Sequence, residues 1–150
     1  MKKRMILLSG SGDTVVWFRL EFIDEFIKKS YTVYVLAPDI RPELKIELDK
    51  RGVQFVYINL ERKGLSLLNL ILSIKELVKI FHKIRPDLIF SYTHKAILSG
   101  SLAAKFLGFS NLYSFITGSG HLFDDKTFKE KLINFSGSLL LRLAWKFNKV

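Results

Sequence analysis

Two short loops in this sequence combine glycine with small hydroxyl residues, a combination suited to holding an anionic ligand. The first is Ser9-Gly10-Ser11-Gly12 and the second is Thr117-Gly118-Ser119-Gly120. Glycine lets the backbone approach a ligand closely, and the start of a following helix favours negative charge. The first loop lacks the G-x-G-x-x-G spacing of a dinucleotide site, because Val15 stands where the third glycine belongs. A tight strand-to-helix turn is the alternative interpretation.

A third candidate is the run Tyr92-Thr93-His94-Lys95, in which a histidine and a lysine are adjacent. Both side chains can reach an anionic or hydroxylated ligand, and histidine can donate or shuttle a proton near neutral pH. The alternative is that Thr93 or His94 only caps the next helix. His121 either contacts a substrate or is a loop histidine without a role. The catalytic candidates are therefore His94 and His121, and the substrate-binding candidates are Gly10, Ser11, Gly12, Thr93, His94, Lys95, Thr117, Gly118 and Gly120.

Other chemistries find no support in the sequence. The chain has no cysteine, which rules out disulfide scaffolds, cysteine nucleophiles and thiolate zinc sites. It has no H-x-x-x-H pair, acidic cluster or G-x-S-x-G elbow, so we expect neither a metal nor another cofactor. Asp39 stands where a dinucleotide fold places its ribose-binding acid, but it follows Pro38 and is interpreted as a turn residue.

The elements that would position these loops alternate between strand and helix. Short apolar runs predict strands at Met5–Leu8, Tyr31–Ala37, Val53–Ile58, Leu88–Tyr92 and Leu112–Ile116. Apolar residues at helical spacing predict helices at Thr14–Lys29, Pro42–Lys50, Leu65–Ile84, Ala96–Leu107 and Phe128–Phe147. Asp13 or Thr14 would cap the first helix, whose buried face would hold Val15, Phe18, Phe22, Phe26 and Ile27.

Helices that alternate with buried strands are typical of a parallel sheet covered on both faces. We therefore expect an α/β, doubly wound, Rossmann-like domain with right-handed crossovers. The 150 residues fit one domain, placed at residues 1–150. Ligands of such sheets bind at the carboxyl ends of the strands, where the candidate loops and the turn at Pro38–Arg41 would meet.

The net charge of +10, from 24 Lys and Arg against 14 Asp and Glu, favours an anionic partner. No apolar run reaches the roughly 18 to 20 residues of a spanning helix, so we expect a chain that is soluble or peripheral to a membrane, in the cytoplasm. Half of the excess charge lies from Lys126 onward, among leucines and aromatic residues. That pattern is typical of a helix on an anionic bilayer, although a core helix with solvated lysines has it too. The predicted membrane-facing residues are Lys129, Lys131, Arg142, Trp145 and Lys146.

Three runs also carry a family resemblance. They are IRPDLIFSYTHKA at Ile84–Ala96, GSLAAKFLG at Gly100–Gly108 and FITGSGHLF at Phe115–Phe123. Together they resemble the N-terminal domain of family 4 glycosyltransferases. More narrowly, they resemble the bacterial enzymes that extend lipid-linked sugars for capsule, O-antigen or glycoprotein assembly.

The resemblance implies the N-terminal, acceptor-binding half of a GT-B enzyme, with the donor-binding domain absent from this chain. The reaction would be retaining transfer from a nucleotide sugar, typically a UDP-sugar, to a polyprenyl-diphosphate-linked glycan, without a metal. Gly10 and Gly12 match the family's first loop, and Thr93, His94 and Lys95 match the loop after the fourth strand. The loop after the fifth strand is matched by Thr117, Gly118 and Gly120. The basic last helix matches the family's membrane-docking surface, which implies a cytoplasmic chain, peripheral on the inner face of the plasma membrane.

Such a half would not transfer sugar by itself, so an alternative is a non-catalytic, membrane-recruiting subunit of a split glycosyltransferase. A different nucleotide-binding module is disfavoured by the missing third glycine and by the interpretation of Asp39. The positive charge permits nucleic-acid binding, but the sequence contains no recognition module, and we expect no nucleic-acid partner.

Overall fold

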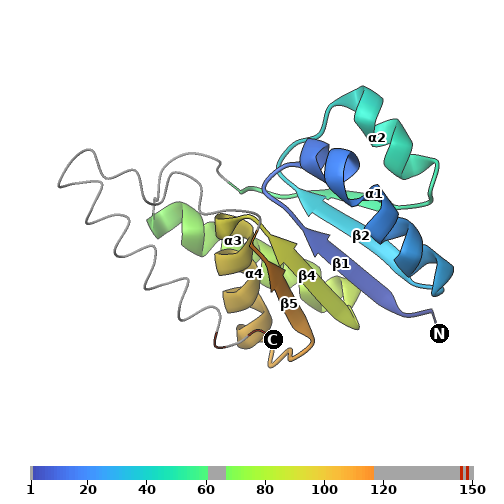
Figure 1. Ribbon diagram of the computed structural model, residues 1–150. Coiled ribbons are helices and arrows are strands. Elements are labelled where there is room, and N and C mark those ends of the chain that lie inside the picture. Colours follow the sequence, from blue (N-terminus) through green and yellow to red (C-terminus); the bar gives the residue numbers. More distant parts are fainter. Residues whose placement is uncertain (1, 61–66, 117–145, 147, 149–150) are drawn as a thin grey trace.

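The computed structural model describes residues 2–60, 67–116, 146 and 148, and it confirms the α/β fold (Figure 1). The order is β1 (Arg4–Leu8), α1 (Gly12–Lys28), β2 (Thr32–Ala37), α2 (Pro42–Asp49), β3 (Gln54–Tyr57), α3 (Leu67–Ile84), β4 (Leu88–Tyr92), α4 (His94–Phe106) and β5 (Leu112–Phe115). All five predicted strands and the first four predicted helices are present, with small shifts of their ends. The last predicted helix, Phe128–Phe147, lies outside the described residues except for Lys146.

The strands form one parallel sheet in the order β3-β2-β1-β4-β5. Helices α1 and α2 cover one face, and α3 and α4 cover the other (Figure 1). The chain runs outward from β1 in one direction and then returns to add β4 on the other side of β1. The boundary between β1 and β4 is therefore the topological switch point, where doubly wound sheets bind their ligands.

Strand β1 is the centre of the hydrophobic core. Met5 and Leu7 pack under α1, whereas Ile6 and Leu8 pack under α3 and α4. All four side chains are fully buried. A strand that is covered on both faces reads as a continuous apolar run, which is why it was visible in the sequence.

The predicted start of α1 is wrong. The helix begins at Gly12 with Ser11 as its N-cap residue, so Asp13 and Thr14 lie inside the first turn. Their side chains serve other partners. The Thr14 hydroxyl donates to the Ser11 carbonyl at 2.9 Å, and the Asp13 carboxylate accepts hydrogen bonds from Arg41 at 2.8 and 2.9 Å.

The predicted burial of Phe18 is also wrong, because this side chain is 67% exposed. The buried stripe of α1 is centred between Val15 and Val16 and continues to Ile23. At 3.6 residues per turn, Phe18 lies about 110° around the helix from the middle of that stripe. Gly52 and Gly108 follow α2 and α4 with φ of 69° and 67°, as expected of glycines that end helices.

Candidate functional site

The loops after β1, β2 and β4 pack directly against one another at the carboxyl edge of the sheet. A Cβ atom added to Gly10 would lie 2.8 Å from Thr93 Oγ1, and one added to Gly12 would lie 2.5 Å from the Asp39 carbonyl oxygen. Both glycines are therefore required by the close approach of neighbouring chain segments. The structure brings six predicted residues to this carboxyl-edge site: Gly10, Ser11, Gly12, Thr93, His94 and Lys95.

Hydroxyl groups fix the loop between β1 and α1. The Ser11 backbone N–H donates to Ser9 Oγ at 3.1 Å, and Ser11 Oγ donates to Asp39 Oδ1 at 2.9 Å. The Gly12 N–H donates to the Asp39 carbonyl oxygen at 2.8 Å. Asp39 thus holds the loop through its backbone and its side chain, in keeping with its interpretation as a turn residue.

Tyr92, at the end of β4, joins this loop through a chain of hydroxyl groups. Its side chain is buried, and its hydroxyl lies 3.1 Å from Thr14 Oγ1, which lies 3.4 Å from Ser9 Oγ. Burial raises the pKa of Tyr92, so its hydroxyl keeps its proton at neutral pH. Ser9 and Tyr92 stand in the candidate runs and Thr14 is a predicted cap, but none of the three is among the predicted site residues. The available signal was their position at the ends of predicted elements.

Thr93 is the strained residue of the site. It has φ 73° and ψ 138°, a region that β-branched residues rarely adopt and that costs on the order of 1–3 kcal/mol. It occupies the N-cap position of α4, but its hydroxyl makes no capping hydrogen bond. Oγ1 is buried and has no hydrogen-bond partner among the described residues. Capping alone therefore does not explain this residue, because a capping hydroxyl bonds to a helix N–H.

His94 and Lys95 are the first two residues of α4, and both are partly buried. Burial lowers the pKa of His94, so its imidazole is mostly neutral at pH 7 and can both donate and accept a hydrogen bond. The free backbone N–H groups at the start of a helix add a positive field at this point. The site therefore combines a neutral imidazole, an unpaired hydroxyl and a field that favours anions.

Several predicted residues lie outside the part of the chain that the structure describes, and their roles stay predictions. They are Thr117, Gly118, Gly120, His121, Lys129, Lys131, Arg142 and Trp145. Lys146 is described and exposed. Asn148 accepts a hydrogen bond from Ser114 at 2.6 Å and donates one to Ser101 at 3.0 Å, so this position lies beside β5 and α4.

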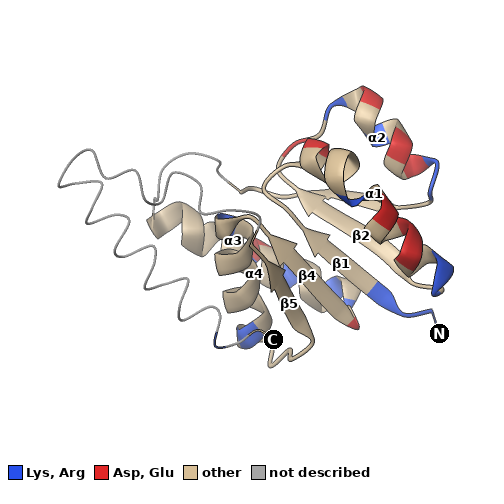
Figure 2. Cartoon of the chain, viewed as in Figure 1, with Lys and Arg blue, Asp and Glu red and all other residues tan. Residues whose placement is uncertain are grey.

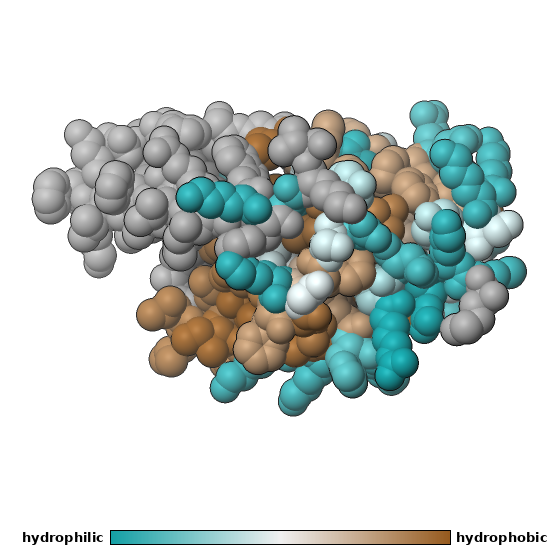
Figure 3. All heavy atoms as spheres, turned by 90° about the horizontal axis from the view of Figure 1, so that it is seen from below, coloured by the Kyte–Doolittle hydropathy of each residue, from teal (hydrophilic) through white to brown (hydrophobic). Residues whose placement is uncertain are grey.

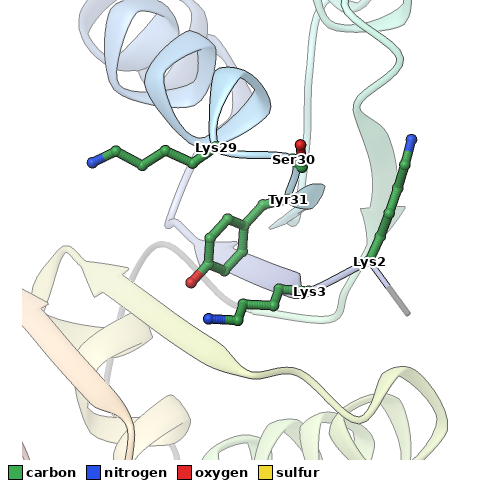
Figure 4. Close-up of a pocket in the computed structure, with 5 residues that line it drawn as sticks. All are labelled: Lys2, Lys3, Lys29, Ser30 and Tyr31. Atoms are coloured by element: carbon green, nitrogen blue, oxygen red, sulfur yellow. The ribbon is translucent and has the colours of Figure 1, made fainter.

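Neither a metal centre nor the amino edge of the sheet offers an alternative site among the described residues. No three His, Cys, Asp or Glu side chains in this part of the chain come together as metal ligands would. A hollow of about 670 Å³ lies at the opposite, amino edge of the sheet, lined by Lys2, Lys3, Lys29, Ser30 and Tyr31. Figure 4 shows that the three lysine ammonium groups there lie apart and do not converge on one point. No described helix is long and apolar enough to cross a membrane.

The characteristic sequence pattern of the glycosyl transferase 4-like family matches residues 5–146, and this chain belongs to that family. One relative is the N,N'-diacetylbacillosaminyl-diphospho-undecaprenol alpha-1,3-N-acetylgalactosaminyltransferase of Campylobacter jejuni. It is 26% identical over 144 residues, which cover 96% of this chain but 38% of the relative. The chain therefore spans well under half the length of that protein.

Solved structures share the fold. A UDP-N-acetylglucosamine 2-epimerase superposes with a TM-score of 0.63 at 16% identity, covering 100% of this chain and 41% of its own. MurG of Acinetobacter baumannii gives 0.60 at 16% identity, covering 76% and 34%. A glycosyltransferase from Rickettsia africae gives 0.60 at 15% identity, covering 85% and 35%. The Rossmann-like domain of GT-B glycosyltransferases and epimerases is thus the fold of this chain.

The lowered pKa of His94 predicts a pH-dependent contribution to stability. The folded chain holds the proton on His94 less tightly than the unfolded chain, so stability falls as the pH drops through the ordinary value of 6.5. His94→Gln should reduce the loss of unfolding free energy between about pH 7.5 and 5.5, as measured by urea denaturation. His82→Gln, at an exposed position on α3, is the matched control. An identical pH dependence in wild type and His94→Gln would contradict this.

Proposed function

We propose that this chain is the acceptor-binding half of a retaining glycosyltransferase. The sugar comes from a nucleotide sugar, a UDP-sugar, and goes to a polyprenyl-diphosphate-linked glycan in surface polysaccharide or glycoconjugate synthesis, without a metal. The observation that carries the proposal is the match, over 96% of the chain, to a transferase whose named acceptor is a diphospho-undecaprenol-linked sugar.

The carboxyl-edge site supplies the groups that such an acceptor requires. The N-termini of α1 and α4 meet there, at the contact between Gly10 and Thr93, and helix N-termini favour a diphosphate. An oxygen atom of the acceptor would satisfy the buried Thr93 hydroxyl. In this proposal neutral His94 hydrogen-bonds the acceptor hydroxyl that is to be glycosylated.

Transfer in this proposal needs a donor-binding domain, in the same polypeptide or in a separate one. The described residues bind and orient the acceptor, and the donor domain presents the nucleotide sugar across a cleft. The 38% share of the Campylobacter transferase that this chain spans is in keeping with that division of labour.

Acceptor binding tests this proposal directly. The wild-type chain should bind an undecaprenyl-diphosphate-linked N-acetylhexosamine in detergent micelles, measured by calorimetry, more tightly than it binds a UDP-sugar. His94→Ala should weaken acceptor binding by about 3- to 10-fold, the value of one hydrogen bond. His82→Ala should leave it unchanged. Tighter binding of the UDP-sugar, or no binding of the acceptor, would refute the assignment as an acceptor half.

We also propose that the chain works on the cytoplasmic surface of an anionic membrane, with α3 as a contact. The first half of α3 exposes Leu67, Leu68, Ile71 and Leu72, at 70, 74, 41 and 55%. Figure 3 shows hydrophobic side chains gathered on one part of the face it draws, with hydrophilic side chains beside them. The outward residues further along α3 are Lys75, Lys79, His82 and Lys83. Leucine with lysine on one exposed helix face is the composition of an interfacial helix.

The position and the charge of α3 support this orientation. The helix links the carboxyl end of β3 to the amino end of β4, so its leucine-rich start lies at the carboxyl edge of the sheet. Acidic residues instead gather on α1 and α2 (Figure 2), where several form ion pairs. A bilayer on α3 would therefore meet little negative charge, and the site would face a lipid-linked acceptor.

Removing two of the exposed leucines should weaken membrane binding. The double variant Leu68→Ser/Leu72→Ser should bind phosphatidylglycerol vesicles at least about tenfold more weakly in a co-sedimentation assay. Each substitution removes part of the roughly 2 kcal/mol gained when a leucine side chain moves from water into the bilayer. Ile46→Ser, at a position on α2 that is 52% exposed, is the matched control. Equal vesicle binding by wild type and the double variant would contradict the role of α3.

A further inference from the structure

Arg19, on α1, differs from Arg41 and Arg51, which flank α2, because no carboxylate neutralises its charge. Arg41 pairs with Asp13 at 2.8 Å, and Arg51 pairs with Asp24 at 3.0 Å. Among the described residues, no acidic side chain forms an ion pair with Arg19. Its Nη1 donates one hydrogen bond, to the Phe18 carbonyl oxygen at 2.8 Å. A guanidinium carries five N–H donors, so most of this capacity is unused within the described part of the chain.

Two aromatic rings hold this guanidinium in place. Its Cζ atom lies 5.1 Å from the ring centroid of Tyr92 and 5.1 Å from that of Phe115. These two residues are register partners at the carboxyl ends of β4 and β5. Stacking on both rings restricts the side chain without neutralising its charge. Arg19 is therefore a preorganised cation at the edge of the sheet where the candidate loops lie.

Packing alone does not account for this arrangement. Arg19 is partly buried, so its charge has lost part of its hydration and its long side chain has lost rotamer freedom. A leucine would cover the same rings without burying a charge and with a smaller loss of rotamer freedom. An anion that binds to the guanidinium would replace the hydrogen bonds lost from water with charge-assisted hydrogen bonds.

Arg19 is coupled to the carboxyl-edge site through Tyr92. The Tyr92 ring makes a cation–π contact with the guanidinium, and the Tyr92 hydroxyl lies 3.1 Å from Thr14 Oγ1 in the first turn of α1. The next residue is the strained Thr93, followed by the start of α4. A ligand at the Thr93 turn therefore meets a helix N-terminus, and the guanidinium of Arg19 lies over the ring of the preceding residue, Tyr92.

We propose that Arg19 binds a phosphate group of the ligand at the carboxyl-edge site, with its planar donor pair on two phosphate oxygens. The ligand class is a phosphate or diphosphate ester. This inference rests on the proposed function for the source of that phosphate, which is the diphosphate of the lipid-linked acceptor or that of the nucleotide sugar.

Calorimetry with three probes tests the proposal on the full chain: inorganic pyrophosphate, farnesyl diphosphate and UDP. Arg19→Gln should weaken pyrophosphate binding at least about tenfold, the effect of losing charge-assisted hydrogen bonds. Arg19→Lys should fall between wild type and Arg19→Gln, because it keeps the charge but loses the fork. Arg51→Gln is the control and should bind like wild type. The same loss with farnesyl diphosphate assigns the phosphate to the acceptor, and the same loss with UDP assigns it to the donor.

Equal dissociation constants for wild type and Arg19→Gln, or no binding of any probe to wild type, would overturn the proposal. Thermal unfolding of each variant identifies a folding defect, and Arg19→Lys decides the matter if Arg19→Gln does not fold. The phosphate site and the acceptor assignment can fail separately. Pyrophosphate binding that depends on Arg19, in a chain that binds no lipid-linked sugar, would uphold the former and refute the latter.

Discussion

The site depends on the close approach of the first loop to the turn between β4 and α4. A single residue, Thr93, separates the end of β4 at Tyr92 from the start of α4 at His94. Connections in α/β units usually have two to six residues, so this one forces an uncommon backbone conformation. The turn fits against the first loop only because Gly10 has no side chain to meet Thr93. The strained conformation of Thr93 is maintained because the core around β1 holds both segments in place.

Several properties of the carboxyl edge follow from that approach. The N-termini of α1 and α4 come to the same edge of the switch point, so both helix ends direct their field there. The hydroxyl of Tyr92 reaches the first turn of α1, while its ring contacts the guanidinium of Arg19. The groups left to meet a ligand are thus hydroxyl groups, a neutral histidine and a stacked cation, because the carboxylates of Asp13 and Asp39 already accept hydrogen bonds from Arg41 and Ser11. Such a set recognises oxygen-rich anions better than it activates a nucleophile.

The sequence predicted the fold well because its signals are local. Buried parallel strands read as apolar runs, and Gly52 and Gly108 stand where helices end. The candidate loops could be located because strand ends in a doubly wound sheet share one edge.

The remaining features depend on tertiary packing and carry no local signal. Neither the positive φ of Thr93 nor the position of Arg19 over the rings of Tyr92 and Phe115 can be deduced from spacing along the chain. Phe18 fits an apolar helical stripe in the sequence, yet it lies outside the face that the sheet covers. The cap of α1 was misplaced because hydrogen bonds to Ser11 and Arg41 occupy the side chains of Thr14 and Asp13.

A phosphate-bearing ligand is thus expected to bind at the carboxyl edge between β1 and β4. The most direct measurement is a titration of the ¹⁵N-labelled chain with farnesyl diphosphate, followed through backbone amide chemical shifts. Binding at this edge predicts the largest shifts in residues 9–14 and 93–96, with little change at the amino-edge residues Lys3, Ser30 and Tyr31. Shifts confined to the lysine-lined hollow at the amino edge would contradict it.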